Sequence, residues 1–231
     1  MNTSKSTIRL LGAAFLFVFV ATIVSTQLLA SIVGSASISD ILVNISDNLA
    51  PIRISILVGL VNSIGIVVLA VLLYIVFNKQ NKITVLVALG LYLGEAITLA
   101  VSYTGLFGLI PLSLEFVKAG APAASYYQTL GNFLYSGVYQ QGYDIHMLFF
   151  CLGGILWYYL FYRSRYIPRV LSVWGLATVC VLFILTLLTL YDRDLGSVIP
   201  LFIIGAPYIV FEALIGPWLM VKGIRDGSET K

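Results

Sequence analysis

Six long stretches with almost no charged residue constrain the fold of this chain more than any other feature of its sequence. Three of them carry no charge, and three carry one ionisable side chain each; they are residues 10–39, 54–78, 170–191, 83–114, 145–162 and 195–221. A hydrocarbon core of about 30 Å is crossed by about 20 helical residues. Each stretch is therefore long enough to form a transmembrane helix.

We expect an all-α, polytopic integral membrane protein, built as a single domain (residues 1–231) with a six-transmembrane-helix bundle. The predicted spans are 8–34, 50–77, 83–109, 142–162, 168–191 and 197–221. Strands are not expected, because the apolar runs lack a two-residue alternation and exceed the roughly ten residues of a barrel strand.

Composition supports the same class of protein. Apolar residues make up 60% of the 231 residues, charged residues only 10%, and the formal net charge is +3. Soluble domains are about 25% charged. These values exclude a soluble globular enzyme and a disordered chain, and no nucleic-acid partner is expected because a clustered basic surface is lacking.

The segment 110–141 between spans three and four differs from its neighbours, being rich in Pro, Ser, Gly and Tyr. Pro122 suits the first turn of a helix, where its missing N–H costs nothing. Apolar and aromatic residues then recur at helical spacing as far as Val138. This pattern predicts an amphipathic helix on the membrane surface; the alternative is a loop with scattered aromatic residues.

The distribution of Lys and Arg predicts the orientation. Ten of the 13 basic residues flank the chain termini, the second connection or the fourth connection: Lys5, Arg9, Lys79, Lys82, Arg163, Arg165, Arg169, Lys222, Arg225 and Lys231. Basic flanks face the cytoplasm, so we expect both termini there, in a bacterial inner membrane. The first apolar run is too long for a cleaved signal peptide.

Aromatic residues gather near the predicted inner interface, where amphipathic rings anchor a helix. They are Trp157, Trp174, Trp218, Tyr158, Tyr159, Tyr162 and Tyr166. Gly90 and Gly94 form a small-residue pair that predicts close helix packing.

No metal or cofactor is expected. Cys151 and Cys180 lie inside predicted spans and suit small apolar packing as free thiols. One histidine and no cysteine pair at ligand spacing argue against zinc or haem. Nucleotide-binding and nucleophile-elbow motifs are lacking.

Two glutamates at bilayer depth are the main candidate site. An ionisable side chain there costs at least about 2.5 kcal/mol on insertion scales. Glu95 shares a helical face with Tyr92, and Glu212 follows Tyr208 by four residues. Pro207 and Pro217 flank Glu212, and each disrupts a backbone hydrogen bond, as in the broken helices of transporters. A neutral Glu in an ordinary kinked helix is the alternative.

A second polar group lies at the predicted outer helix ends. Arg53 begins the second span, and His146 lies near the start of the fourth, two residues after Asp144. Arg53 and His146 either line the mouth of a funnel leading to the two Glu residues, or serve as interfacial residues, with Arg53 pairing with lipid phosphate or Asp144. Asp144 and His146 point in nearly opposite directions on a helix.

Three motifs carry a family resemblance: PIRISILVGL at the second span, FFCLGGILWYYLFYRSRYIPRVLS at the fourth, and ALIGPWLMVKGIR after Glu212. Together they resemble the bacterial multi-pass membrane family catalogued as domain of unknown function 4386. The resemblance assigns its characteristic positions to Arg53, Glu95, Arg163, Ser164, Pro168, Arg169, Glu212, Trp218 and Gly223. Ser172 departs from the glycine common in that family, which has no assigned activity.

Three functions are compatible with these features. The first is a bundle that binds or moves a small solute, a proton or a lipid through Glu95 and Glu212. The second is an intramembrane enzyme acting on a lipid-like substrate, with Glu95, Glu212 or His146 as acid or base. The third is a structural or sensory membrane protein with a solid interior. The substrate and the oligomeric state are not encoded in any recognisable motif.

Overall fold

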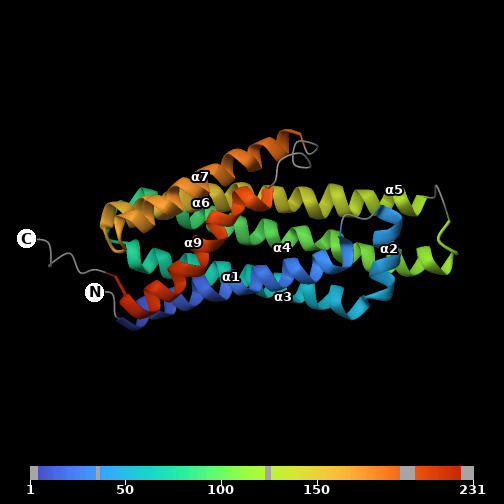
Figure 1. Cartoon of the computed structure of the whole chain (residues 1–231), viewed down its shortest axis with the longest axis horizontal. Coiled ribbons are helices and arrows are strands. Elements are labelled where there is room, and N and C mark those ends of the chain that lie inside the picture. Colours follow the sequence, from blue (N-terminus) through green and yellow to red (C-terminus); the bar gives the residue numbers. More distant parts are fainter. Residues whose placement is uncertain (1–4, 35–36, 123–125, 193–200, 225–231) are drawn as a thin grey trace, which may run out of the picture. The chain divides into compact units, whose positions relative to one another are not determined.

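The computed structural model describes residues 5–34, 37–122, 126–192 and 201–224, and every element in these ranges is helical. The elements are α1 (Lys5–Val33), α2 (Ile38–Asp47), α3 (Leu49–Phe77), α4 (Lys82–Lys118), α5 (Tyr126–Asn132), the π-helix η1 (Phe133–Gln140), α6 (Gln141–Ser164), α7 (Arg169–Tyr191) and α9 (Leu201–Lys222) (Figure 1). The all-α prediction is confirmed.

Six helical stretches are long and apolar enough to cross a membrane, which confirms the predicted number of spans. They are Lys5–Val33, Leu49–Phe77, Lys82–Lys118, Tyr126–Ser164, Arg169–Tyr191 and Ile204–Lys222. Many of their large apolar side chains are exposed, among them Ile64 at 65% and Ile97 at 63%. Such a surface is stable only in an apolar solvent, so a lipid bilayer is the environment of these helices.

The third span continues past its predicted end at residue 109. Helix α4 passes through Pro111 and ends at Lys118. A proline removes one helical hydrogen bond, but this part of the helix is well packed: Leu112, Ser113 and Phe116 are all buried. Packing of these side chains outweighs the lost bond.

The separate surface helix expected between spans three and four is not present, and that prediction is wrong. Residues 126–164 form one unbroken helical stretch of 39 residues, in which α5 and η1 lead directly into α6. The segment is helical, as its periodicity predicts, but it packs along α2. Gly131 lies against Ile38 and Leu42, and Gln128 Nε2 donates to Ser39 Oγ at 2.6 Å. This tertiary contact could not be read from the pattern.

Helix α2 itself was missed. Its start is a capping box in which the Asp40 N–H donates to Ser37 Oγ and the Ser37 N–H donates to Asp40 Oδ2, both at 3.3 Å. The spacing Ser-x-x-Asp is the sequence signal of such a start. Ile41, Leu42 and Ile45 bury its apolar face.

The chain divides into two compact units that cut across the long helices. Unit 1 comprises Met1–Phe19, Ile64–Ala96 and Asp144–Lys231, and unit 2 comprises Val20–Ser63 and Ile97–Tyr143. In unit 1, helices α1 and α9 cross at two glycines: a Cβ on Gly12 would lie 2.6 Å from the Gly216 carbonyl oxygen. Each unit is described by itself below.

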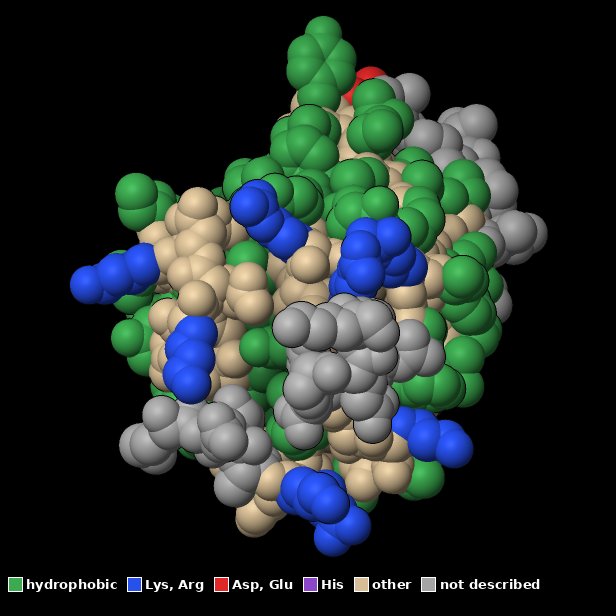
Figure 2. Space-filling view, turned by 90° about the vertical axis from the view of Figure 1, so that its left-hand side faces the viewer, with side chains coloured by type: hydrophobic (Ala, Val, Ile, Leu, Met, Phe, Trp, Pro, Cys, Tyr) green, Lys and Arg blue, Asp and Glu red, His purple; other side chains and the backbone are tan. Residues whose placement is uncertain are grey.

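Basic side chains gather at one end of unit 1 (Figure 2). There α1, α4 and α7 begin, and α3, α6 and α9 end. The basic residues described at these helix ends are Lys5, Arg9, Lys79, Lys82, Arg163, Arg165, Arg169 and Lys222. We call this surface the basic end of unit 1.

Candidate functional site

Tyr92 and Glu95 lie one helical turn apart on α4, within unit 1. Both are buried, with 3% and 4% of their surface exposed. Residues three apart in a helix face the same side, so α4 presents a hydroxyl and a carboxylate to the interior of unit 1. This face is the starting point of the candidate site.

Helices α6 and α9 contribute a pair of buried tyrosines. The hydroxyl groups of Tyr158 on α6 and Tyr208 on α9 form a hydrogen bond of 2.8 Å. Phe211 packs edge-on against Tyr158 at a ring distance of 4.9 Å, and Phe150 packs edge-on against Tyr208 at 5.4 Å. These aromatic contacts fix the positions of both hydroxyl groups.

Two glycines make room for the rings of the site. A Cβ on Gly153 of α6 would lie 2.5 Å from the Tyr92 ring, and a Cβ on Gly175 of α7 would lie 2.5 Å from the Phe211 ring. Real side chains do not approach so closely. The sequence therefore needs glycine at both positions for α4 and α9 to place their aromatic side chains.

The two glutamates belong to the same group of side chains. Glu95 and Glu212 lie within electrostatic range of each other. Tyr92 and Tyr158 each interact electrostatically with both carboxylates. We call Tyr92, Glu95, Tyr158, Tyr208 and Glu212 the carboxylate–tyrosine cluster. Two carboxylates within this range repel each other when both are charged.

Four of the six candidate residues from the sequence thus meet in unit 1: Tyr92, Glu95, Tyr208 and Glu212. His146 is buried in the same unit, on α6 one turn before Phe149, which lies against Gly94 of α4 next to Glu95. Arg53 is an exposed residue of α3 in unit 2. The funnel linking Arg53 and His146 to the glutamates remains a prediction.

Two residues assigned to the membrane interface belong to the interior instead. Trp157 and Tyr158 are buried, with 0% and 1% exposure, while the neighbouring Tyr159 is 40% exposed. Successive residues of a helix point 100° apart, so a run of aromatic residues cannot all anchor at the interface. Because neighbouring residues of this run are all aromatic, its composition does not distinguish the buried Tyr158 from the exposed Tyr159.

Close helix packing, predicted for both Gly90 and Gly94 on α4, is found at only one of the two glycines. Gly94 lies against Phe149, whose ring would be 2.9 Å from an added Cβ, but nothing lies within 4 Å of an added Cβ at Gly90.

The two cysteines of the chain, Cys151 and Cys180, are free thiols. Cys151 is buried, and its sulfur lies 3.9 Å from Thr186 Oγ1. In the described ranges, no three His, Cys, Asp or Glu side chains gather closely enough to hold a metal ion.

A buried polar cluster in unit 2 was missed altogether. Ser25 Oγ donates to the Ser55 carbonyl at 3.0 Å, and Ser55 Oγ donates to the Ser25 carbonyl at 2.9 Å. Tyr103 Oη lies 3.1 Å from Ser25 Oγ. Reciprocal serine bonds of this kind join α1 to α3, and polar bonds across helices are a common source of cohesion in membranes. A single uncharged Ser changes the mean hydropathy of a long apolar helix very little, so the sequence does not reveal this cluster.

The fold and the lipid-facing surface define a multi-pass helical membrane protein. Comparison with protein families places it more narrowly: the model of the family described as Domain of unknown function (DUF4386) matches residues 10–223, and the chain belongs to this family. The resemblance inferred from the sequence motifs is thereby confirmed. A search of curated proteins and a search of solved structures each found no match.

Proposed function

We propose that the carboxylate–tyrosine cluster is a proton-binding site and that the protein moves protons across the bilayer through it. The observation that supports this proposal is that Glu95 and Glu212 lie within electrostatic range of each other and of Tyr92 and Tyr158. Intramembrane ionisable residues commonly mark such pathways.

The chemistry of the cluster suits proton transfer. A carboxylate holds or releases a proton, and a tyrosine hydroxyl can both donate and accept a hydrogen bond. The Tyr158–Tyr208 pair therefore offers a step by which a proton can pass between groups near Glu95 and groups near Glu212.

The same proposal includes an orientation in a bacterial inner membrane. The basic end of unit 1 faces the cytoplasm, so both termini are cytoplasmic. The gathering of Lys and Arg at the six helix ends supports this orientation, because flanking positive charge is retained on the cytoplasmic side.

Proton movement can be measured in proteoliposomes that enclose the pH-sensitive dye pyranine. A potassium gradient with valinomycin sets the membrane potential, and the dye reports the proton flux. We expect vesicles with the wild-type chain to show proton flux. In vesicles with Glu95→Gln or Glu212→Gln, the rate of proton flux should be no higher than in protein-free vesicles. Glu115→Gln is the matched control, because Glu115 lies on the same helix but is exposed and lies 3.9 Å from Lys118.

Two outcomes would contradict the proposal. Wild-type vesicles without proton flux would favour a structural role for a neutral, closed cluster. Wild-type rates in both Glu→Gln variants would place the pathway elsewhere. No specific observation favours the intramembrane enzyme.

A further inference from the structure

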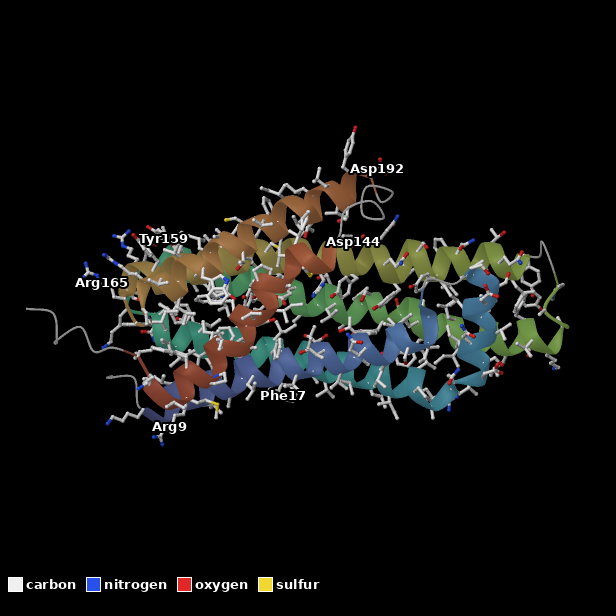
Figure 3. The ribbon with its side chains drawn as sticks, viewed as in Figure 1. Arg9, Phe17, Asp144, Tyr159, Arg165 and Asp192 are labelled. Carbon is white, nitrogen blue, oxygen red and sulfur yellow. The ribbon has the colours of Figure 1, made fainter. Side chains whose placement is uncertain are left out.

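Three arginines surround the short connection between α6 and α7 at the basic end of unit 1. Arg163 lies in the last turn of α6, Arg165 follows the helix, and Arg169 is the first residue of α7. All three are exposed. Figure 3 shows Arg165 at the same end of unit 1 as Arg9.

Tyrosine side chains contact two of these guanidinium groups, one through its hydroxyl and one through its ring. Arg163 Nη1 donates to Tyr159 Oη at 3.1 Å, and Arg169 Cζ lies 5.4 Å from the centre of the Tyr162 ring. An arginine already held by a tyrosine side chain loses less freedom when it binds a ligand. The guanidinium groups keep donors that the rings do not use.

Acidic partners from the same helices are remote. Within the described part of α6 and α7, Asp144 lies about 28 Å from Arg163 along the helix axis. Asp192, which follows α7, lies about 34 Å from Arg169 by the same measure. Figure 3 shows both aspartates well separated from Arg165. In the described part of α6 and α7, no carboxylate therefore neutralises the positive charge at this connection, which can attract an anion.

We propose that Arg163, Arg165 and Arg169 bind the phosphodiester headgroup of an anionic phospholipid such as phosphatidylglycerol or cardiolipin. Arginine matches the geometry of phosphate oxygens with paired donors. A lipid is favoured over a soluble phosphate because exposed apolar surface continues from the arginines along α7: Val170 is 81% exposed and Val173 is 49% exposed. Acyl chains would cover that surface.

The proposal separates a built site from general attraction between a positive surface and an anionic membrane. Any basic residue near the surface adds attraction worth about 1 kcal/mol, and lysine and arginine contribute alike. A phosphate site depends on the paired donors of arginine, which lysine lacks. Changing all three arginines to lysine preserves the charge and removes the paired donors.

Native mass spectrometry of the full chain in detergent measures lipid retention directly. Purified protein is supplied with equal amounts of phosphatidylglycerol and phosphatidylcholine. We expect the wild-type chain to retain more phosphatidylglycerol than phosphatidylcholine. In the triple Arg→Lys variant the ratio of the two retained lipids should fall about tenfold, because charged hydrogen bonds to the phosphate are lost. Lys79→Ala with Lys82→Ala is the control; it lowers the charge of the same end and should keep the preference.

Three further results decide the proposal. Unchanged preference in the triple Arg→Lys variant would overturn it in favour of general surface charge. Competition by free glycerol phosphate as strong as that by phosphatidylglycerol would overturn the lipid in favour of a soluble phosphate ligand. If the triple variant does not fold, the single variant Arg165→Lys, placed in the exposed connection, must still lower the preference. None of these three results depends on proton flux, so the lipid proposal and the proton proposal fail separately.

Discussion

The hydroxyl groups of Tyr158 and Tyr208 illustrate how single residues govern the interior of unit 1. Each is buried, at 1% and 5% exposure, and each satisfies the other through a bond of 2.8 Å. A buried polar group that loses its partner costs about 1–3 kcal/mol, whereas removing both partners can be nearly neutral. The pair is therefore energetically coupled.

A double-mutant cycle tests this coupling. We expect Tyr158→Phe and Tyr208→Phe to lower the free energy of unfolding individually, and the double Phe variant to lose less than the sum. The interaction energy should be about 0.6–1.7 kcal/mol, the range of interhelical bonds in membranes. Unfolding of the purified protein in mixed detergent micelles by added SDS measures it, with exposed Tyr162→Phe as the control. Additive losses would show that the hydrogen bond contributes nothing measurable.

At the scale of elements, glycine decides how closely two helices approach. Gly12 of α1 and Gly216 of α9 bring the two backbones together, and the atoms that would meet an added Cβ on Gly12 include the Gly216 carbonyl oxygen at 2.6 Å and the Met220 nitrogen at 2.8 Å. Backbone atoms cannot move aside as a flexible side chain can. Gly90 of α4 is the contrasting case, exposed and with nothing within 4 Å of an added Cβ.

The two glycines therefore predict opposite responses to alanine. Gly12→Ala should destabilise the protein by about 1–3 kcal/mol, since the helices must separate. Gly90→Ala should be neutral or stabilise by up to about 1 kcal/mol, because alanine is the better helix former. The same SDS titration compares both variants with the wild-type chain. A loss at Gly90 equal to that at Gly12 would mean that helix contact does not explain the difference.

For the whole molecule, orientation follows from where charge gathers. The first described residue of α1, Lys5, and the last residue of α9, Lys222, both lie at the basic end of unit 1. Unit 2 carries the acidic residues Asp40 and Asp47 on α2. Positive charge is costly to move across the membrane against the potential, so the basic end should remain in the cytoplasm.

Cysteine labelling tests this orientation in bacterial cells that express the chain. The natural thiols are replaced through Cys151→Ala and Cys180→Ala, and one new thiol is placed by Asp47→Cys or Lys222→Cys, both exposed positions. A membrane-impermeant maleimide should label Asp47→Cys in intact cells, and Lys222→Cys only after permeabilisation. The reverse pattern would show that the protein has the opposite orientation.

Much of this protein could be read directly from its sequence, because crossing a bilayer is a local requirement. A run of about 20 apolar residues must form a helix in lipid, where every backbone N–H and C=O needs a partner within its own segment. The six spans and the unusual position of Glu95 and Glu212 follow from that rule. The charge asymmetry behind the predicted orientation is local in the same way.

Tertiary structure decided which side chains meet. Glu95 and Glu212 are 117 residues apart in the chain, and their proximity depends on how α4, α6 and α9 pack. Hydropathy is nearly uniform along such helices, so it does not show which face of α6 carries Tyr158 inward, or that α5 packs along α2. Those choices rest on steric fit at a few glycines and on hydrogen bonds between helices, and both exist only once distant segments are in contact.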